Sequence, residues 1–166
     1  MPNIYAPVFD EPRASLDGFH AQRARLGHQL GTERVGLSLW EVPPGQAVYP
    51  YHFHLAEEEV LVVLEGRPLL RSPEGWRRLE RGEVVRFPVG EDGANQLVND
   101  TAETLRFLSL STHGRPDVVI YPDEGKLCAA ERTADGSGLK TFFRLADQVP
   151  YDEGIQRPET DHVDPA

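Results

Sequence analysis

The alternation of apolar and polar positions along the chain predicts short strands rather than helices. Runs rich in Val, Leu and Phe recur from about residue 35 to residue 121, and Gly and Pro residues separate them. Amphipathic periods of helix length are scarce in the same region. Short strands bounded by turn residues are typical of an antiparallel barrel or sandwich. We therefore predict an all-β fold.

Turn residues set the limits of the predicted strands. Pro43, Pro44 and Gly45 end a strand at residues 35–42, because proline cannot donate a ladder hydrogen bond and glycine accommodates the turn. Residues 22–30 hold a further extended stretch near the N-terminus. By the same criteria, strands are expected at residues 51–54, 59–65, 68–71, 76–79, 83–87, 96–99, 104–112 and 117–121.

The length of the chain predicts a single domain over residues 1–166. With 166 residues and 39% hydrophobic content, the chain is long enough for one buried core and too short for two ordinary domains. We place the core barrel at about residues 32–122, after an N-terminal extension at residues 1–31. Residues 123–166 form a C-terminal extension that packs on the barrel and has a loose, acidic end.

The charge balance limits the classes of partner. There are 17 basic and 27 acidic residues, and the net charge of -10 repels nucleic-acid phosphates and anionic lipid headgroups. No apolar run is long enough to span a membrane, and residues 1–7 lack the features of a secretory signal. Cys128 is the only cysteine, so no intrachain disulfide can form. We expect a cytoplasmic protein that binds a small molecule.

His52, His54 and Glu59 are the main candidates for chemistry. The two histidines are one residue apart, so in an extended strand both imidazoles lie on one face. Imidazole nitrogens and carboxylate oxygens are ligands of divalent transition metals, which makes a metal site the first hypothesis. The alternative interpretation is a solvated, hydrogen-bonded strand edge.

Residues 45–66 resemble the first motif of the cupin superfamily. In that motif a glycine leads to His-x-His, a glutamate follows, and a second glycine ends the strand; Glu59 and Gly66 match the last interval. The resemblance implies a jelly-roll barrel with a mononuclear metal near its mouth, and it suggests a homodimer built by sheet extension. Residues 82–99 resemble the second motif through Gly82, Pro88, Gly90 and Asn99.

The second motif departs from the family pattern at its histidine. That histidine normally stands four positions before the terminal asparagine, which here is Asn95, whereas counting forward from Gly90 leads to Gly93. We favour Asn95 as the fourth metal ligand, because the segment after Gly90 can lengthen while strand pairing keeps Asn95 and Asn99 on one face. No histidine lies anywhere in residues 55–112.

Two functions remain open at this point. His52, His54 and Glu59 leave open coordination positions, and Asn95 or water could complete the shell of one divalent transition metal, namely Fe, Mn, Ni, Co or Zn. This outcome predicts a metal-dependent enzyme of unassigned reaction that acts on a polar, oxygen-rich substrate. Alternatively, the missing imidazole leaves the metal site degraded or empty, and the protein is a non-catalytic cupin that binds a sugar or similar ligand.

Other histidines and two arginines are weaker candidates for functional residues than His52, His54 and Glu59. His20, His28 and the later His113 are candidates for substitute ligands, although an isolated histidine is more often a surface or core residue. Arg23 and Arg25 have two-residue spacing and could line a partner surface or clamp a carboxylate in the barrel mouth. A solvated strand face is the ordinary explanation for such a pair.

Overall fold

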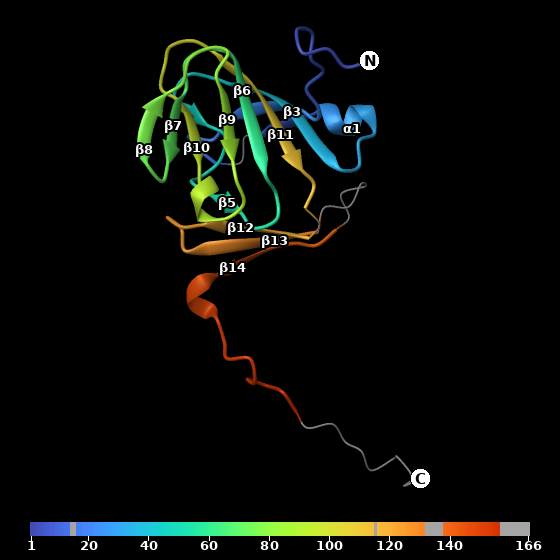
Figure 1. Ribbon diagram of the computed structural model, residues 1–166, viewed down its shortest axis with the longest axis vertical. Coiled ribbons are helices and arrows are strands. Elements are labelled where there is room, and N and C mark those ends of the chain that lie inside the picture. Colours follow the sequence, from blue (N-terminus) through green and yellow to red (C-terminus); the bar gives the residue numbers. More distant parts are fainter. Residues whose placement is uncertain (14–15, 115, 132–137, 157–166) are drawn as a thin grey trace.

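The computed structural model describes residues 1–13, 16–114, 116–131 and 138–156, and most of its elements are antiparallel strands (Figure 1). Helical structure in these residues is limited to α1 (Leu26–Leu30) and the 3-10 turns η1 (Glu91–Gly93) and η2 (Leu145–Asp147). None of the described helices has the length and apolar character needed to cross a membrane. The prediction of an all-β fold is confirmed.

Two sheets form the jelly-roll barrel. The first has six strands in the order β1 (Glu11–Arg13), β2 (Ala21–Ala24), β3 (Val35–Val42), β11 (Leu105–Thr112), β6 (Glu59–Glu65) and β9 (Val84–Phe87). The second has four strands in the order β4 (Gln46–Ala47), β10 (Gln96–Asn99), β7 (Leu69–Ser72) and β8 (Gly75–Arg78).

The core lies between these two sheets and consists of alternate residues of their strands. Leu61 and Val63 of β6 and Leu97 of β10 are buried in it, together with Leu70 and Leu105. Burying one such side chain stabilises the fold by about 1.5–3 kcal/mol. The alternating apolar positions in the sequence therefore correspond to the side chains that point into the core.

A third sheet lies across one end of the barrel (Figure 1). Its four strands are β14 (Lys140–Arg144), β13 (Lys126–Ala130), β12 (Asp117–Tyr121) and β5 (Phe53–His54). Because β12 pairs with β5, the segment after residue 116 lies directly beside the His-x-His segment. The third sheet thus determines the surroundings of the candidate ligands.

The strand β14 docks on this sheet by backbone pairing with β13. Its two phenylalanines stay half-exposed, at 55% for Phe142 and 51% for Phe143. Docking therefore depends more on ladder hydrogen bonds than on burial of apolar surface. In Figure 1 residues 145–156 leave the barrel and extend away from it.

The extended stretch predicted at residues 22–30 is only partly correct. The strand β2 ends at Ala24, and α1 begins at Leu26, which is buried at 2% exposure. Gly31 ends the helix in the left-handed conformation, with φ of 72°, and its N–H donates to the carbonyl of His28. A glycine at this position is the usual helix C-cap. The helix is too short for its period to be visible in the sequence.

Candidate metal centre

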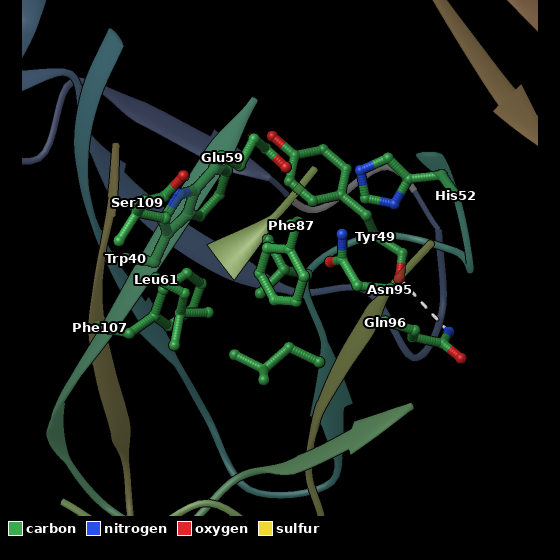
Figure 2. Close-up of a pocket in the computed structure, with 13 residues that line it drawn as sticks. Trp40, Tyr49, His52, Glu59, Leu61, Phe87, Asn95, Gln96, Phe107 and Ser109 are labelled. Carbon is green, nitrogen blue, oxygen red and sulfur yellow. Dashed lines mark hydrogen bonds between the residues drawn. The ribbon is translucent and has the colours of Figure 1, made fainter. Parts of the chain in front are cut away.

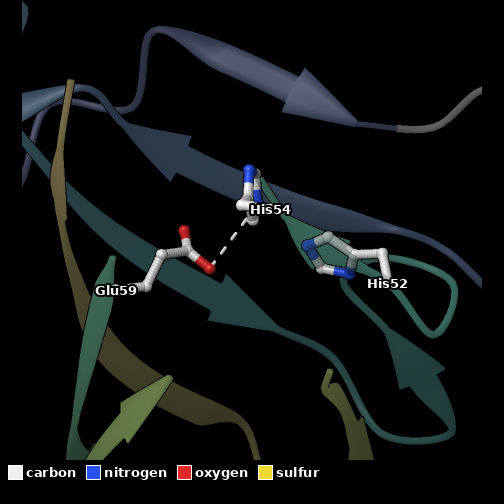
Figure 3. A group of neighbouring side chains, drawn as sticks. All are labelled: His52, His54 and Glu59. Carbon is white, nitrogen blue, oxygen red and sulfur yellow. Dashed lines mark ion pairs between the residues drawn. The ribbon is translucent and has the colours of Figure 1, made fainter. Parts of the chain in front are cut away.

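The structure brings His52, His54 and Glu59 together at the end of the barrel that the third sheet covers (Figure 3). His54 belongs to β5, His52 lies just before it, and Glu59 is the first residue of β6. One potential ligand atom of each residue lies within 4.8 Å of those of the other two. The Nε2 atom of His54 is 3.7 Å from Oε2 of Glu59.

Hydrogen bonds orient both imidazoles in the same way. Nδ1 of His52 is 2.9 Å from the carbonyl oxygen of Pro50, which can only accept, so Nδ1 carries the hydrogen. Nδ1 of His54 is 2.6 Å from Oδ2 of Asp117, a fully buried carboxylate that also accepts the N–H of Ala56. In the neutral rings, both Nε2 atoms therefore keep their lone pairs for a ligand. Partners of this kind fix the orientation of metal-binding histidines.

The two histidines differ in how readily they take up a proton. Burial, together with the charge of the neighbouring His54, lowers the pKa of His52 to about 4. Burial acts in the same direction on His54, but the hydrogen bond to Asp117 and the charges of Glu59, Asp117 and Glu57 raise the pKa of His54 above its usual value. His52 is thus a neutral donor near pH 7, and a proton at this site resides on His54.

Asp117 and Glu57 are two residues of the site that the sequence analysis did not identify. Glu57 is buried at 2% exposure, and with His54 and Asp117 it forms a second group of atoms that lie within 4.8 Å of one another. One sequence signal was available for Asp117, because it opens an otherwise apolar strand and a buried carboxylate requires a partner. No comparable signal marked Glu57.

Asn95 lies opposite His52. The two backbones form an isolated bridge with hydrogen bonds of 3.1 and 2.9 Å. The side chain of Asn95 is buried, and its Nδ2 donates to the carbonyl of Gly93, which leaves the amide oxygen as its acceptor. Asn95 also lines a cavity of about 50 Å³ with His52 and Glu59. Figure 2 shows Glu59, Tyr49 and His52 gathered at one end of this cavity.

Gly93 cannot be the position of the missing family histidine. A Cβ atom at Gly93 would lie 1.7 Å from the carbonyl oxygen of Pro88, so no side chain fits there. The lack of space at Gly93 favours Asn95 as the position that corresponds to that histidine, and the assignment of Asn95 as a metal ligand stays a prediction.

The donor set fits one divalent transition metal. Two imidazole nitrogens and a carboxylate oxygen are typical ligands of Zn, Fe and related ions. An ion about 2.1 Å from each of two ligands spans at most about 4.2 Å between them. The 3.7 Å separation of His54 and Glu59 lies within that limit. The three substitute candidates, His20, His28 and His113, all lie in the described part of the chain but outside this group of ligand atoms.

The site opens into a larger cleft of about 1130 Å³. One wall is the inner face of the six-stranded sheet, where Arg23, Ser38, Ser109 and Ser111 replace the apolar residues found deeper in the barrel. The other wall belongs to the third sheet and includes Tyr121. A cleft of this kind suits a polar small molecule.

Comparisons with known proteins agree with this architecture. Residues 38–111 match a family model described as "Cupin domain". Among solved structures, a candidate sugar phosphate isomerase from Acidithiobacillus ferrooxidans is 28% identical with a TM-score of 0.71, over 85% of this chain and 83% of that chain. A sugar phosphate isomerase of the cupin superfamily from Silicibacter pomeroyi is 26% identical with a TM-score of 0.70, over 82% and 83% of the two chains.

A polyketide cyclase from Streptomyces resistomycificus is also similar, with 30% identity and a TM-score of 0.50 over 58% of this chain and 68% of that chain. No curated protein sequence matches the chain significantly. The two isomerases are thus similar to this chain over most of its length, whereas the cyclase shares little more than the barrel.

Proposed function

Because the chain belongs to the cupin superfamily, we propose that it is a metal-dependent enzyme that isomerises a phosphorylated sugar. The observation that carries the proposal is that one ring nitrogen each of His52 and His54 and a carboxylate oxygen of Glu59 lie within 4.8 Å of one another. The proposed metal ligands are His52, His54 and Glu59, with Asn95 as a weaker fourth. Similarity to two sugar phosphate isomerases over more than four-fifths of each chain supports the substrate class.

A bound divalent metal would polarise the carbonyl or hydroxyl oxygens of the sugar as a Lewis acid. The residues of the chain hold the remaining parts of the mechanism. Pro50 and Asp117 keep the two imidazoles aimed at one point. The third sheet covers this end of the barrel (Figure 1) and forms one wall of the cleft. Isomerisation also requires a group that moves a proton between adjacent carbons. Glu57, which lines the cleft beside His54, is the carboxylate we assign to that role.

Metal analysis of the purified protein tests the proposal. We expect close to one metal per chain after loading with Fe, Mn, Ni, Co or Zn, and we expect His52→Ala to abolish it. His28→Ala is the matched control, because His28 lines the same cleft outside the ligand group. Asn95→His should tighten binding by restoring an imidazole. Stoichiometric metal in a His52→Ala, His54→Ala double variant would contradict the assigned ligands.

The reaction is tested separately from the metal. Metal-loaded protein should catalyse exchange of the proton next to the sugar phosphate carbonyl with solvent deuterium, measured by proton NMR. Glu57→Gln should lose this exchange and keep the metal. Exchange at the wild-type rate in Glu57→Gln would remove Glu57 from the proposed mechanism.

A non-catalytic sugar-binding cupin is the second candidate, and Asn95 favours it. An amide that donates to Gly93 stands where the family places an imidazole, which weakens metal affinity. Sugar binding that needs no metal, together with a site that stays metal-free after loading, would support this alternative.

The homodimer expected from the family resemblance stays a proposal. In the described part of the chain, β14 is an edge strand of the third sheet and carries the half-exposed Phe142 and Phe143. An edge of this kind is suited to sheet extension by a second copy.

A further inference from the structure

We infer that the inner face of the six-stranded sheet holds an anion subsite centred on Arg23, which binds the phosphate group of the substrate. This inference rests on the proposed function, which places the sugar end of the same molecule at His52, His54 and Glu59. It identifies Arg23 as the residue that distinguishes a phosphorylated sugar from a free sugar.

Arg23 is held in a fixed position on the wall of the cleft. It pairs in register with Trp40 of β3, and its guanidinium carbon lies 5.0 Å from the centre of the Trp40 ring. Its Nε donates to Oγ of Ser38 over 2.9 Å. Both partners are buried, at 2% exposure for Trp40 and 4% for Ser38. A guanidinium fixed by stacking and a hydrogen bond loses little conformational entropy when it binds an anion.

Hydroxyl groups extend the subsite along the same face. Ser109 pairs in register with Ser38, and Ser111 pairs with both Gly36 and Glu59. All three serines line the cleft. Oγ of Ser38 accepts from Arg23, so its own hydrogen is available to donate. The row of hydroxyls therefore runs from Arg23 towards the candidate metal ligands.

Gly36 leaves room for part of this row. A Cβ atom at Gly36 would lie 2.3 Å from Oγ of Ser111 and 2.9 Å from Nε2 of His113. These two polar atoms therefore converge over bare backbone. One guanidinium with several hydroxyls can satisfy the many oxygens of a phosphate monoester, whereas a carboxylate has only two oxygens. The geometry thus favours a phosphate over a sugar acid.

The spacing between the two ends suits a phosphorylated sugar. Ser38 on β3 and Glu59 on β6 are separated by β11. Two strand spacings amount to roughly 10 Å, which an extended sugar phosphate can bridge. Glu33 and Glu131 also line the cleft, and the net charge of the protein is -10. Arg25 and Lys140 line the cleft as well, so the inference rests on the fixed position of the Arg23 guanidinium and not on the net charge of the cleft.

Calorimetric titration of the full chain with ribose 5-phosphate, ribose and inorganic phosphate tests the inference, with and without a metal chelator. We expect Arg23→Gln to weaken ribose 5-phosphate binding at least tenfold and to leave ribose binding unchanged. Arg23→Lys should recover part of the loss. Arg77→Gln removes the same charge from an exposed position outside the cleft and should bind as the wild type does. Melting temperatures report whether each variant is folded.

Wild-type protein that binds ribose 5-phosphate no better than ribose, or Arg23→Gln with unchanged affinity, would overturn the subsite. Gluconate binding as tight as ribose 5-phosphate would also overturn it, because the subsite would then be one for carboxylates. The experiments distinguish failure of the proposed function from failure of the Arg23 subsite. Loss of metal binding contradicts the proposed function, whereas Arg23-dependent phosphate affinity in the chelator-treated protein supports the subsite on its own.

Discussion

Lowering the pH of the metal-free protein from 7.5 to 5 should reduce its stability through His52. Burial and the neighbouring His54 lower the pKa of His52 to about 4 in the folded chain, against 6.5 for an ordinary histidine. As pH falls below 6.5, the unfolded chain takes up a proton at His52 and the folded chain does not. The unfolded state is therefore favoured progressively down to the folded pKa. At pH 5 the resulting loss is about 2 kcal/mol of unfolding free energy.

His54 acts in the opposite direction. Its pKa is raised in the folded chain, since the bond to Asp117 and nearby carboxylate charges outweigh the effect of burial. A raised histidine pKa gives stability that is complete below the unfolded pKa and is lost as pH rises through the folded pKa. The pH profile of the wild type combines both histidines, so the contribution of His52 requires a comparison of variants.

The assay is urea unfolding of wild type and His52→Gln at pH 5, 6 and 7.5 in the presence of a chelator. Glutamine can still donate to the carbonyl of Pro50 but does not titrate. The wild type should lose about 2 kcal/mol more than the variant between pH 7.5 and pH 5. The exposed His28 provides a control, and His28→Gln should follow the wild-type profile. Parallel profiles for wild type and His52→Gln would refute the reasoning.

Two further predictions concern residues that support the site. Asp117→Asn keeps an acceptor for His54 but removes the charge, so metal affinity should fall about 10–100-fold in a competition titration. The surface variant Asp123→Asn is the control and should bind metal as the wild type does. Equal metal affinities in the two variants would argue against a role for Asp117. Gly93→Ala places a Cβ against the carbonyl of Pro88 and should lower the unfolding free energy by about 3 kcal/mol; a melting temperature equal to that of the wild type would contradict the close approach.

The barrel strands were predictable because their signals are local. The run at residues 59–65 alternates between the core and the outer face, and β6 occupies exactly these residues in the structure. The pairing of His52 and His54 with Glu59 was also predictable, because the spacing of the first motif is short. Asn95 was chosen over Gly93 on strand facing alone, and the lack of space at Gly93 supports that choice.

The parts that escaped prediction depend on contacts between distant segments. Asp117 is 63 positions from His54 in the sequence, and only the pairing of β5 with β12 brings the two together. Arg23 donates to Ser38 across the β2–β3 pair. Its two-residue spacing from Arg25 could not show that the Arg23 side chain faces the cleft, because that depends on how β2 pairs with β3. The helix α1 has five residues, too few for a helical period to separate it from a strand.

The hydrogen bond between His54 and Asp117 joins a residue inside the segment that matches the cupin family to a residue outside it. Residues 38–111 carry the family pattern, and Asp117 lies beyond them. A fragment trimmed to residues 38–111 would keep every proposed ligand yet lose the Asp117 carboxylate that orients His54. Under the proposed function, β12 would therefore help to set the metal preference although it lies outside the matched segment, and redesign of the proposed centre should begin with β12 rather than with the histidines.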